Sequence, residues 1–102
     1  FAIELEIIDF GTVVEKLLGQ SFDAIIIGWT NVGSDPDDRS LFSIQNDEVG
    51  AGVNFVSFSN EQVEANLNDG VAVAGCAEDD RAPFYLENQE IFKDEVAYAI
   101  LY

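Results

Sequence analysis

Carboxylates are the reactive side chains that this chain carries in number. It has 20 acidic residues against 4 basic ones, with one cysteine and no histidine. Catalysis that needs a histidine and the ordinary kinds of zinc site are therefore excluded. A pair of carboxylates can act as general acid and base, but among so many acids close neighbours occur by chance. A solvated acidic surface is the better interpretation, and we predict no catalytic residue, no cofactor and no enzymatic activity.

Two smaller features could also do chemistry. Asp35, Asp37 and Asp38 form an acidic cluster, but it lacks the glycine and the distal glutamate of a calcium-binding loop. Helix capping and solubility explain these acids better. Cys76 cannot form an internal disulfide, and a lone cysteine between two small residues is typical of a small buried residue rather than of a nucleophile. We therefore predict no metal ligand.

The charge balance excludes several classes of partner. The formal net charge is -16 at pH 7, whereas binding to nucleic acid or to anionic membranes needs clustered Lys and Arg. The acids are spread along the whole chain, which indicates an acidic surface rather than an interaction tail. Such a surface repels itself unless salt screens it, and the Debye length falls from ~10 Å at 0.1 M to ~3 Å at 1 M salt. The composition therefore predicts a halophilic source.

The size and hydropathy of the chain predict a single folded domain over residues 1–102. Hydrophobic residues make up 48% of it, which is the content of a folded chain. No apolar run approaches the ~20 residues that a membrane span needs. The chain contains no methionine, so we expect it to be a piece of something longer or a processed product.

The N-terminal part predicts a strand, a helix and a second strand. Residues 2–8 alternate apolar and acidic side chains, as in a strand with one buried face. Asp9 is a candidate N-cap for a helix over 10–18, which Gly19 would end. The apolar run within 22–30 predicts a strand buried on both faces. Two parallel strands joined by a helix form a right-handed βαβ unit.

The end of that second strand is where we expect a ligand. The strand closes on Gly28 and Trp29, the only tryptophan, and a polar loop with Asp35 and Pro36 follows. Open α/β sheets bind ligands where a buried strand runs into such a loop. Asp35 and Pro36 also predict the cap and the first residue of a short helix.

Two helices and a strand are predicted after this loop. Ser59 with Gln62 three residues later forms a capping box. A second helix is expected to begin between residues 77 and 83, because Pro83 is tolerated only near a first turn, and Lys93 falls in its last turn. The apolar run 96–102 predicts a C-terminal strand. The predicted fold class is α/β, with a βαβ unit, two later helices and a C-terminal strand.

The order of these motifs resembles a known family. The segments FDAIIIGWT, SDPDD, VSFSNEQVEANL and DDRAPFYLENQEIFKDEVAYAILY follow one another as in the extracytoplasmic solute-binding proteins of ABC importers, in the family that captures oligopeptides, dipeptides and nickel complexes (family 5). The features of that family fall on Gly28-Trp29, Asp35-Pro36, Phe58-Ser59-Asn60, Arg81-Ala82 with Tyr85, and Leu101-Tyr102. The resemblance covers nearly the whole chain. It implies part of the second lobe of a periplasmic-binding-protein-like II fold, with helix over most of residues 60–74.

The resemblance implies a function in transport. Proteins of this kind capture a small solute or peptide between two lobes and deliver it to a membrane permease, outside the cytoplasm and commonly with a lipid anchor. The resemblance implies a ligand-binding site at Gly28, Trp29, Thr30, Asn31 and Val32. Of these, Trp29, Thr30 and Asn31 match positions that line the ligand cleft in the family. Peptide-binding members carry an Asp at the position of Val32 that pairs with the ligand's α-amino group. An apolar residue cannot hold an ammonium, so a sugar, another organic solute or a capped ligand is as plausible as a free peptide.

Two other interpretations remain open. A free-standing acidic α/β interaction module without a ligand cleft would be a natural product of about this length. A small acid-dependent hydrolase would carry a carboxylate with a strongly raised pKa in a pocket. Both rank below solute binding.

Overall fold

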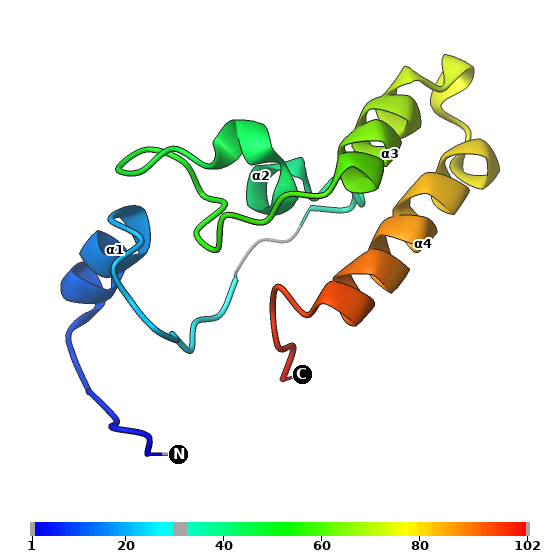
Figure 1. Cartoon of the computed structure of the whole chain (residues 1–102). Coiled ribbons are helices and arrows are strands. Elements are labelled where there is room, and N and C mark those ends of the chain that lie inside the picture. Colours follow the sequence, from blue (N-terminus) through cyan, green and yellow to red (C-terminus); the bar gives the residue numbers. More distant parts are fainter. Residues whose placement is uncertain (1, 30–32, 102) are drawn as a thin grey trace.

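The described part of the chain is built from helices and irregular segments. The computed structural model describes residues 2–29 and 33–101, and it has no strand among them. The helices are α1 (Phe10–Leu18), α2 (Arg39–Phe42), α3 (Glu61–Ala72) and α4 (Glu78–Glu95), with 3-10 turns η1 (Ile44–Asn46) and η2 (Ala74–Cys76). Figure 1 shows α3 and α4 side by side as an antiparallel hairpin, with α1 at the other side of the molecule.

The predicted α/β fold class is therefore wrong. Residues 2–8, 22–29 and 96–101, which the sequence assigns to strands, form no β-ladder, so there is neither a βαβ unit nor a C-terminal strand in the described residues. The partial lobe of a periplasmic-binding-protein-like II fold is absent from them for the same reason. An alternating pattern favours an extended backbone, but a strand also needs a neighbour for its backbone hydrogen bonds. Without that neighbour the segments stay exposed, as at Ile7, which is 89% accessible.

Helix α1 forms where the sequence predicts it. The Asp9 carboxylate accepts a hydrogen bond from the Thr12 backbone N–H (3.2 Å) and another from the Thr12 hydroxyl (2.6 Å). The helix ends at Leu18, and the N–H of the C-cap residue Gly19 donates to the carbonyl of Glu15 at 2.9 Å. Both ends thus depend on contacts within the segment, which is why the local sequence predicts them.

The short helix in the central loop begins later than expected. Asp38, rather than Asp35, precedes the first residue of α2, and the Asp38 side chain makes no capping hydrogen bond. The Asp35 carboxylate accepts instead from the Asp37 backbone N–H at 3.1 Å, which forms a local turn ahead of the helix.

Helix α3 is capped one residue after the predicted position. The Asn60 side chain, not that of Ser59, accepts from the backbone N–H groups of Gln62 (2.9 Å) and Val63 (3.1 Å). The helix ends at Ala72, and η2 follows, so that only part of the segment 71–75 continues the helix. The prediction of helix over most of 60–74 is confirmed.

Helix α4 begins at Glu78, inside the predicted window. Pro83 lies in its second turn rather than its first, so one backbone donor is missing there. Acidic residues fill the first turn and Lys93 lies in the last, as the helix dipole favours. The helix ends at Glu95, and the C-cap residue Val96 adopts the left-handed conformation (φ 49°, ψ 45°).

The core lies along the α3–α4 hairpin. Val63 and Leu67 of α3 pack with Phe58 and with Tyr85 of α4. Phe42 of α2 joins this cluster through aromatic contacts, stacked on Phe92 (ring centroids 3.9 Å apart) and edge-on to Phe58 (5.6 Å). Helix α2 is thereby attached to one face of the hairpin.

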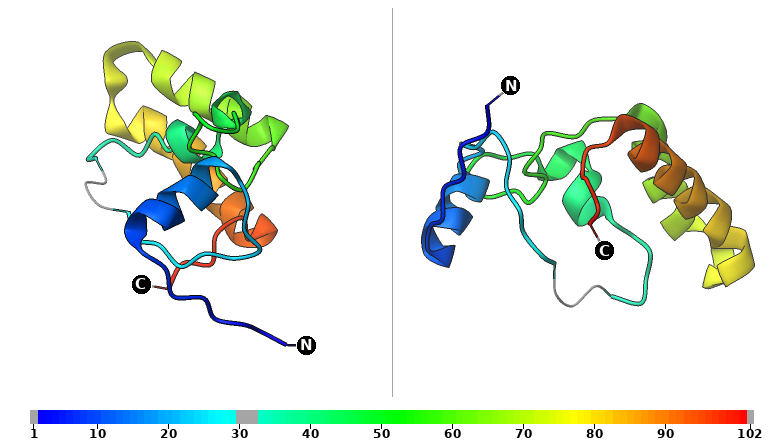
Figure 2. Two further views of the ribbon diagram at one scale, coloured as in Figure 1. Left: turned by 90° about the vertical axis from the view of Figure 1, so that its left-hand side faces the viewer. Right: turned by 90° about the horizontal axis from the view of Figure 1, so that it is seen from below.

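The molecule is elongated. Its principal extents are 47 × 29 × 24 Å and its radius of gyration is 15.4 Å, against roughly 13 Å for a compact chain of this length. The right view of Figure 2 shows the reason: α1 and the α3–α4 hairpin lie at opposite ends, with α2 between them. The accessible surface of 7581 Å² is about a third more than a compact monomer of this mass exposes.

Candidate functional site

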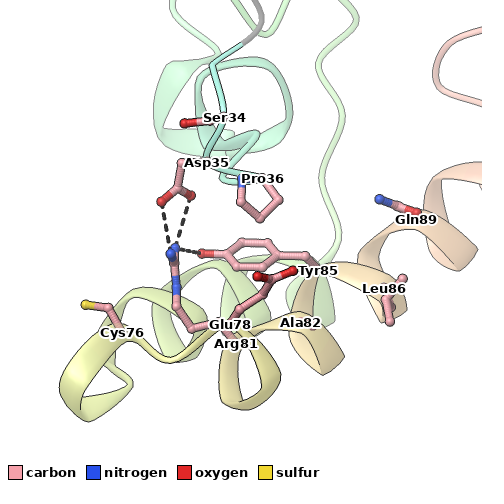
Figure 3. Close-up of a pocket in the computed structure, with 10 residues that line it drawn as sticks. All are labelled: Ser34, Asp35, Pro36, Cys76, Glu78, Arg81, Ala82, Tyr85, Leu86 and Gln89. Atoms are coloured by element: carbon pink, nitrogen blue, oxygen red, sulfur yellow. Dashed lines mark hydrogen bonds and ion pairs between the residues drawn. The ribbon is translucent and has the colours of Figure 1, made fainter.

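A cavity of about 520 Å³ lies between the loop after residue 33 and the beginning of α4. The loop contributes Ser34, Asp35 and Pro36, and α4 contributes Arg81, Tyr85 and Gln89 among others. Figure 3 shows Asp35 facing the guanidinium of Arg81 across this space, with the Tyr85 hydroxyl against the same guanidinium. The cavity thus combines charged, polar and apolar side chains, as ligand sites do.

The central contact is a two-pronged ion pair between residues 46 positions apart. Arg81 Nη1 donates to Asp35 Oδ2 at 3.0 Å, and Nη2 donates to Oδ1 at 3.0 Å. The Arg81 side chain is 16% exposed and that of Asp35 is 56% exposed. This parallel geometry is the strongest that a guanidinium and a carboxylate form. It holds the loop against the hairpin.

Two further groups of the protein bind the Arg81 guanidinium. Its Nε donates to the carbonyl of Gly70 at 2.9 Å, and Nη2 donates to the Tyr85 hydroxyl at 2.8 Å. A Cβ atom on Gly70 would lie 2.8 Å from the Tyr85 ring, so the absence of a side chain there lets the ring reach the arginine. The Gly70 carbonyl, the Tyr85 hydroxyl and the Asp35 carboxylate therefore orient this guanidinium.

A second arginine, Arg39, also donates a hydrogen bond to a backbone carbonyl of α3. Arg39 Nη2 donates to the carbonyl of Leu67 at 2.7 Å, while its Nε lies 2.7 Å from Asp37 Oδ2. The C-terminal half of α3 thus meets two guanidinium groups, which suits the negative end of its dipole. Each arginine is neutralised by an aspartate from the segment Asp35–Asp38.

The pKa values of the two aspartates at the ends of that segment, Asp35 and Asp38, are shifted in opposite directions. The hydrogen bonds from Arg81 hold the pKa of Asp35 below its ordinary value. Burial, together with the neighbouring charge of Asp37, raises the pKa of Asp38. An ionised Asp35 paired in this way is a poor general base. The arrangement suits binding of a charged group rather than acid–base chemistry.

The residues that the resemblance assigns to the ligand cleft lie elsewhere. Gly28 and Trp29 are exposed and do not line the cavity, while Thr30, Asn31 and Val32 lie outside the described residues. Trp29, 43% exposed, stacks on Phe55 with ring centroids 6.0 Å apart and planes 12° from parallel. Trp29 therefore offers a half-open aromatic surface, separate from the Asp35–Arg81 pair.

The cysteine is not buried, contrary to the sequence-based expectation. Cys76 is exposed at the edge of the cavity, and its backbone has φ 54° in the turn η2. Small neighbours favour burial only where a core exists to receive the side chain, and this turn lies beyond the end of α3.

Residues 2–29 and 33–101 contain no group of three or more His, Cys, Asp or Glu side chains placed to hold a metal ion. No helix in that part of the chain is both long and apolar enough to cross a membrane.

The sequence places Asp35, Arg81 and Tyr85 in motifs of separate segments, but it does not indicate that they are in contact. A signal was present in the composition: with 4 basic residues in the whole chain, each is expected to find an acidic partner. With 20 candidate partners, however, the pattern cannot say which one.

Comparison of the chain with protein-family models, with curated proteins and with solved structures gave no match.

Proposed function

We propose that this chain is part of the substrate-binding component of an ABC importer of the oligopeptide and dipeptide type. In this role it captures a small solute for delivery to a membrane permease, outside the cytoplasm. One observation carries the proposal: positions from two motifs of the resemblance, Asp35-Pro36 and Arg81 with Tyr85, line one cavity. Segments that converge on a cavity with a preset guanidinium suit a binding protein better than a solvated acidic module.

The half-open stack of Trp29 on Phe55 supports the same role. Stacked aromatic rings present a flat apolar face to sugar rings, peptide planes and aromatic solutes. Trp29 is the only tryptophan, so its fluorescence reports on this surface alone.

The proposal is tested first by the mass and location of the native polypeptide, detected with an antibody raised against this chain. We expect a product several times larger than 11.2 kDa, located outside the cytoplasm and retained with the permease. A cytoplasmic product of about the chain's own mass would contradict transport, and an acidic interaction module would then be the better interpretation.

Solute binding is tested by titrating the protein with a dipeptide and with a disaccharide while recording Trp29 fluorescence and heat. We expect one class of solute to change the emission, and Trp29→Ala to weaken the heat signal. Phe10→Ala is the matched control, since Phe10 is also a large exposed aromatic residue but lies on α1. Equal losses in both variants would contradict a role for Trp29 in binding.

A further inference from the structure

The guanidinium of Arg81 is held ready for an anion. Gly70 and Tyr85 fix its Nε and one N–H of Nη2, and its carbon lies 5.3 Å from the centre of the Tyr85 ring. These contacts occupy the inner side of the guanidinium. One N–H of Nη1 and the other N–H of Nη2 point together toward the loop, in the spacing that matches a carboxylate.

Asp35 fills that outer edge from an exposed loop. Both its oxygens are used, at 3.0 Å each, yet more than half of its side chain is accessible to solvent. The neighbouring pair differs in kind, since Asp37 binds Arg39 only two positions away and is 18% exposed. The Asp37–Arg39 pair belongs to the local turn, whereas the Asp35–Arg81 pair closes a long-range contact at the edge of a cavity.

The walls beside this ion pair suit a small organic acid. Pro36, Ala82 and Leu86 supply apolar surface, while Ser34 and Gln89 supply hydrogen-bonding groups. A molecule with one carboxylate and a short, mainly apolar body would place its charge on Arg81 and its body in the cavity.

We propose that Arg81 is the binding site for a solute carboxylate and that Asp35 occupies this site, as a tethered competitor, until a solute replaces it. The inference rests on the proposed function and names the substrate class for it. A tethered carboxylate acts at an effective concentration of the order of millimolar. A free carboxylate therefore binds only when its concentration is high enough to displace the Asp35 carboxylate from Arg81. Its binding is thus coupled to release of the loop around Asp35.

The test uses N-acetylalanine, which has one carboxylate, no amine and a small apolar body. The chain has two arginines, Arg39 and Arg81, so the Nε–Hε signals in a nitrogen-15 NMR spectrum number two, and Arg39 is an internal reference. We expect Asp35→Asn to bind the probe at least about tenfold more tightly than the unaltered protein, with the shift on the Arg81 signal. Asp37→Asn, which changes the charge equally, should behave as the unaltered protein does.

Two further measurements keep the inference open to refutation if the variant loses its fold. In the unaltered protein, a high concentration of N-acetylalanine should shift the Arg81 signal and the Asp35 carboxyl resonance together, whereas its uncharged methylamide should shift neither. Adding Arg81→Lys to Asp35→Asn should reverse the gain, because lysine keeps the charge but loses the fork.

Equal affinity in the Asp35→Asn, Asp37→Asn and unaltered proteins would overturn the inference, as would a shift confined to Arg39. The ion pair would then be a structural clamp only. That result would leave the proposed transport role standing, because transport is judged by the mass and location of the native polypeptide.

Discussion

Asn54 shows how one polar side chain can organise a loop. It is fully buried, donates from Nδ2 to the carbonyls of Ser43 (3.2 Å) and Phe58 (2.8 Å), and accepts from the Phe58 N–H (3.0 Å). The side chain thereby satisfies the N–H and carbonyl of Phe58, which lie outside any helix, and adds a second donor to the Ser43 carbonyl, which also accepts from the Asn46 N–H at 3.0 Å. It ties the segment before α3 to the residues after α2.

We expect Asn54→Ala to lower the free energy of unfolding by about 2–4 kcal/mol, because it leaves buried backbone groups without partners and opens a cavity. Urea denaturation measures the change. The control is Asn68→Ala, at an exposed position of α3, which we expect to stay within about 0.5 kcal/mol. Similar effects of the two substitutions would refute this role of Asn54.

Val96 carries backbone strain at the end of α4. A β-branched residue in the left-handed region is disfavoured by about 1–2 kcal/mol, and Val96 has φ 49°. Its side chain is 61% exposed, so it contributes little to the packing of the core. We expect Val96→Gly to raise the free energy of unfolding by about 1 kcal/mol, measured by thermal and urea unfolding.

The control for that prediction is Val71→Gly, at an exposed position inside α3. There glycine replaces a residue of ordinary helical conformation, so the same chemical change should destabilise by a few tenths of a kcal/mol. The prediction fails if both substitutions change stability in the same direction.

At the scale of elements, the α3–α4 hairpin has a polar as well as an apolar seam. Asn66 and Asn88 are both buried, and Asn66 Nδ2 donates to Asn88 Oδ1 at 2.9 Å and to Glu87 Oε2 at 3.0 Å. Apolar packing alone would allow the two helices to slide, whereas paired amides fit in one register. The hairpin therefore provides a rigid support for Arg81.

The loop between Asp35 and Asp38 should show opposite pH effects at its two ends. The folded-state pKa of Asp35 is lowered, so its stabilising contribution is complete above its ordinary value of 3.8 and disappears as the pH falls through the lowered pKa. The folded-state pKa of Asp38 is raised, so its ionisation destabilises the fold as the pH rises from 3.8 through that raised value.

We therefore expect Asp35→Asn to be less stable than the unaltered protein at pH 7, and Asp38→Asn to be more stable. Both differences should shrink near pH 2, where the carboxyl groups are protonated. Urea unfolding at the two pH values and constant ionic strength measures them. A stabilising Asp35→Asn at pH 7, or differences that do not change with pH, would contradict the assignment.

At the scale of the whole molecule, charge and shape act together. A net charge of -16 on an elongated chain creates self-repulsion that salt screens. We expect the Tm to climb steeply from dilute buffer to molar salt, as measured by circular dichroism. A variant with Glu4→Gln and Asp79→Asn, both exposed positions, should show a shallower climb. A Tm that does not respond to salt would contradict the halophilic interpretation.

The helices show what the sequence determines by itself. Helix α1 is capped by Asp9 at its beginning and by Gly19 at its end. Helix α3 is capped at its beginning by Asn60, one residue from the predicted cap. All three residues form hydrogen bonds to backbone groups within four residues. The acidic first turn of α4 and Lys93 in its last are local in the same sense. Such contacts depend only on residues that are neighbours in the sequence, so periodicity and capping rules predict them well.

Only the tertiary structure decides the rest. The alternating segment 2–8 and the apolar runs 22–29 and 96–101 have the composition of strands, but a strand exists only where a neighbour completes its hydrogen bonds, and none does so within the described residues. The pairing of Arg81 with Asp35 and the stacking of Trp29 on Phe55 likewise join distant segments. With 20 acids and 12% aromatic residues to choose from, partner choice follows from how the chain packs, which no local pattern records.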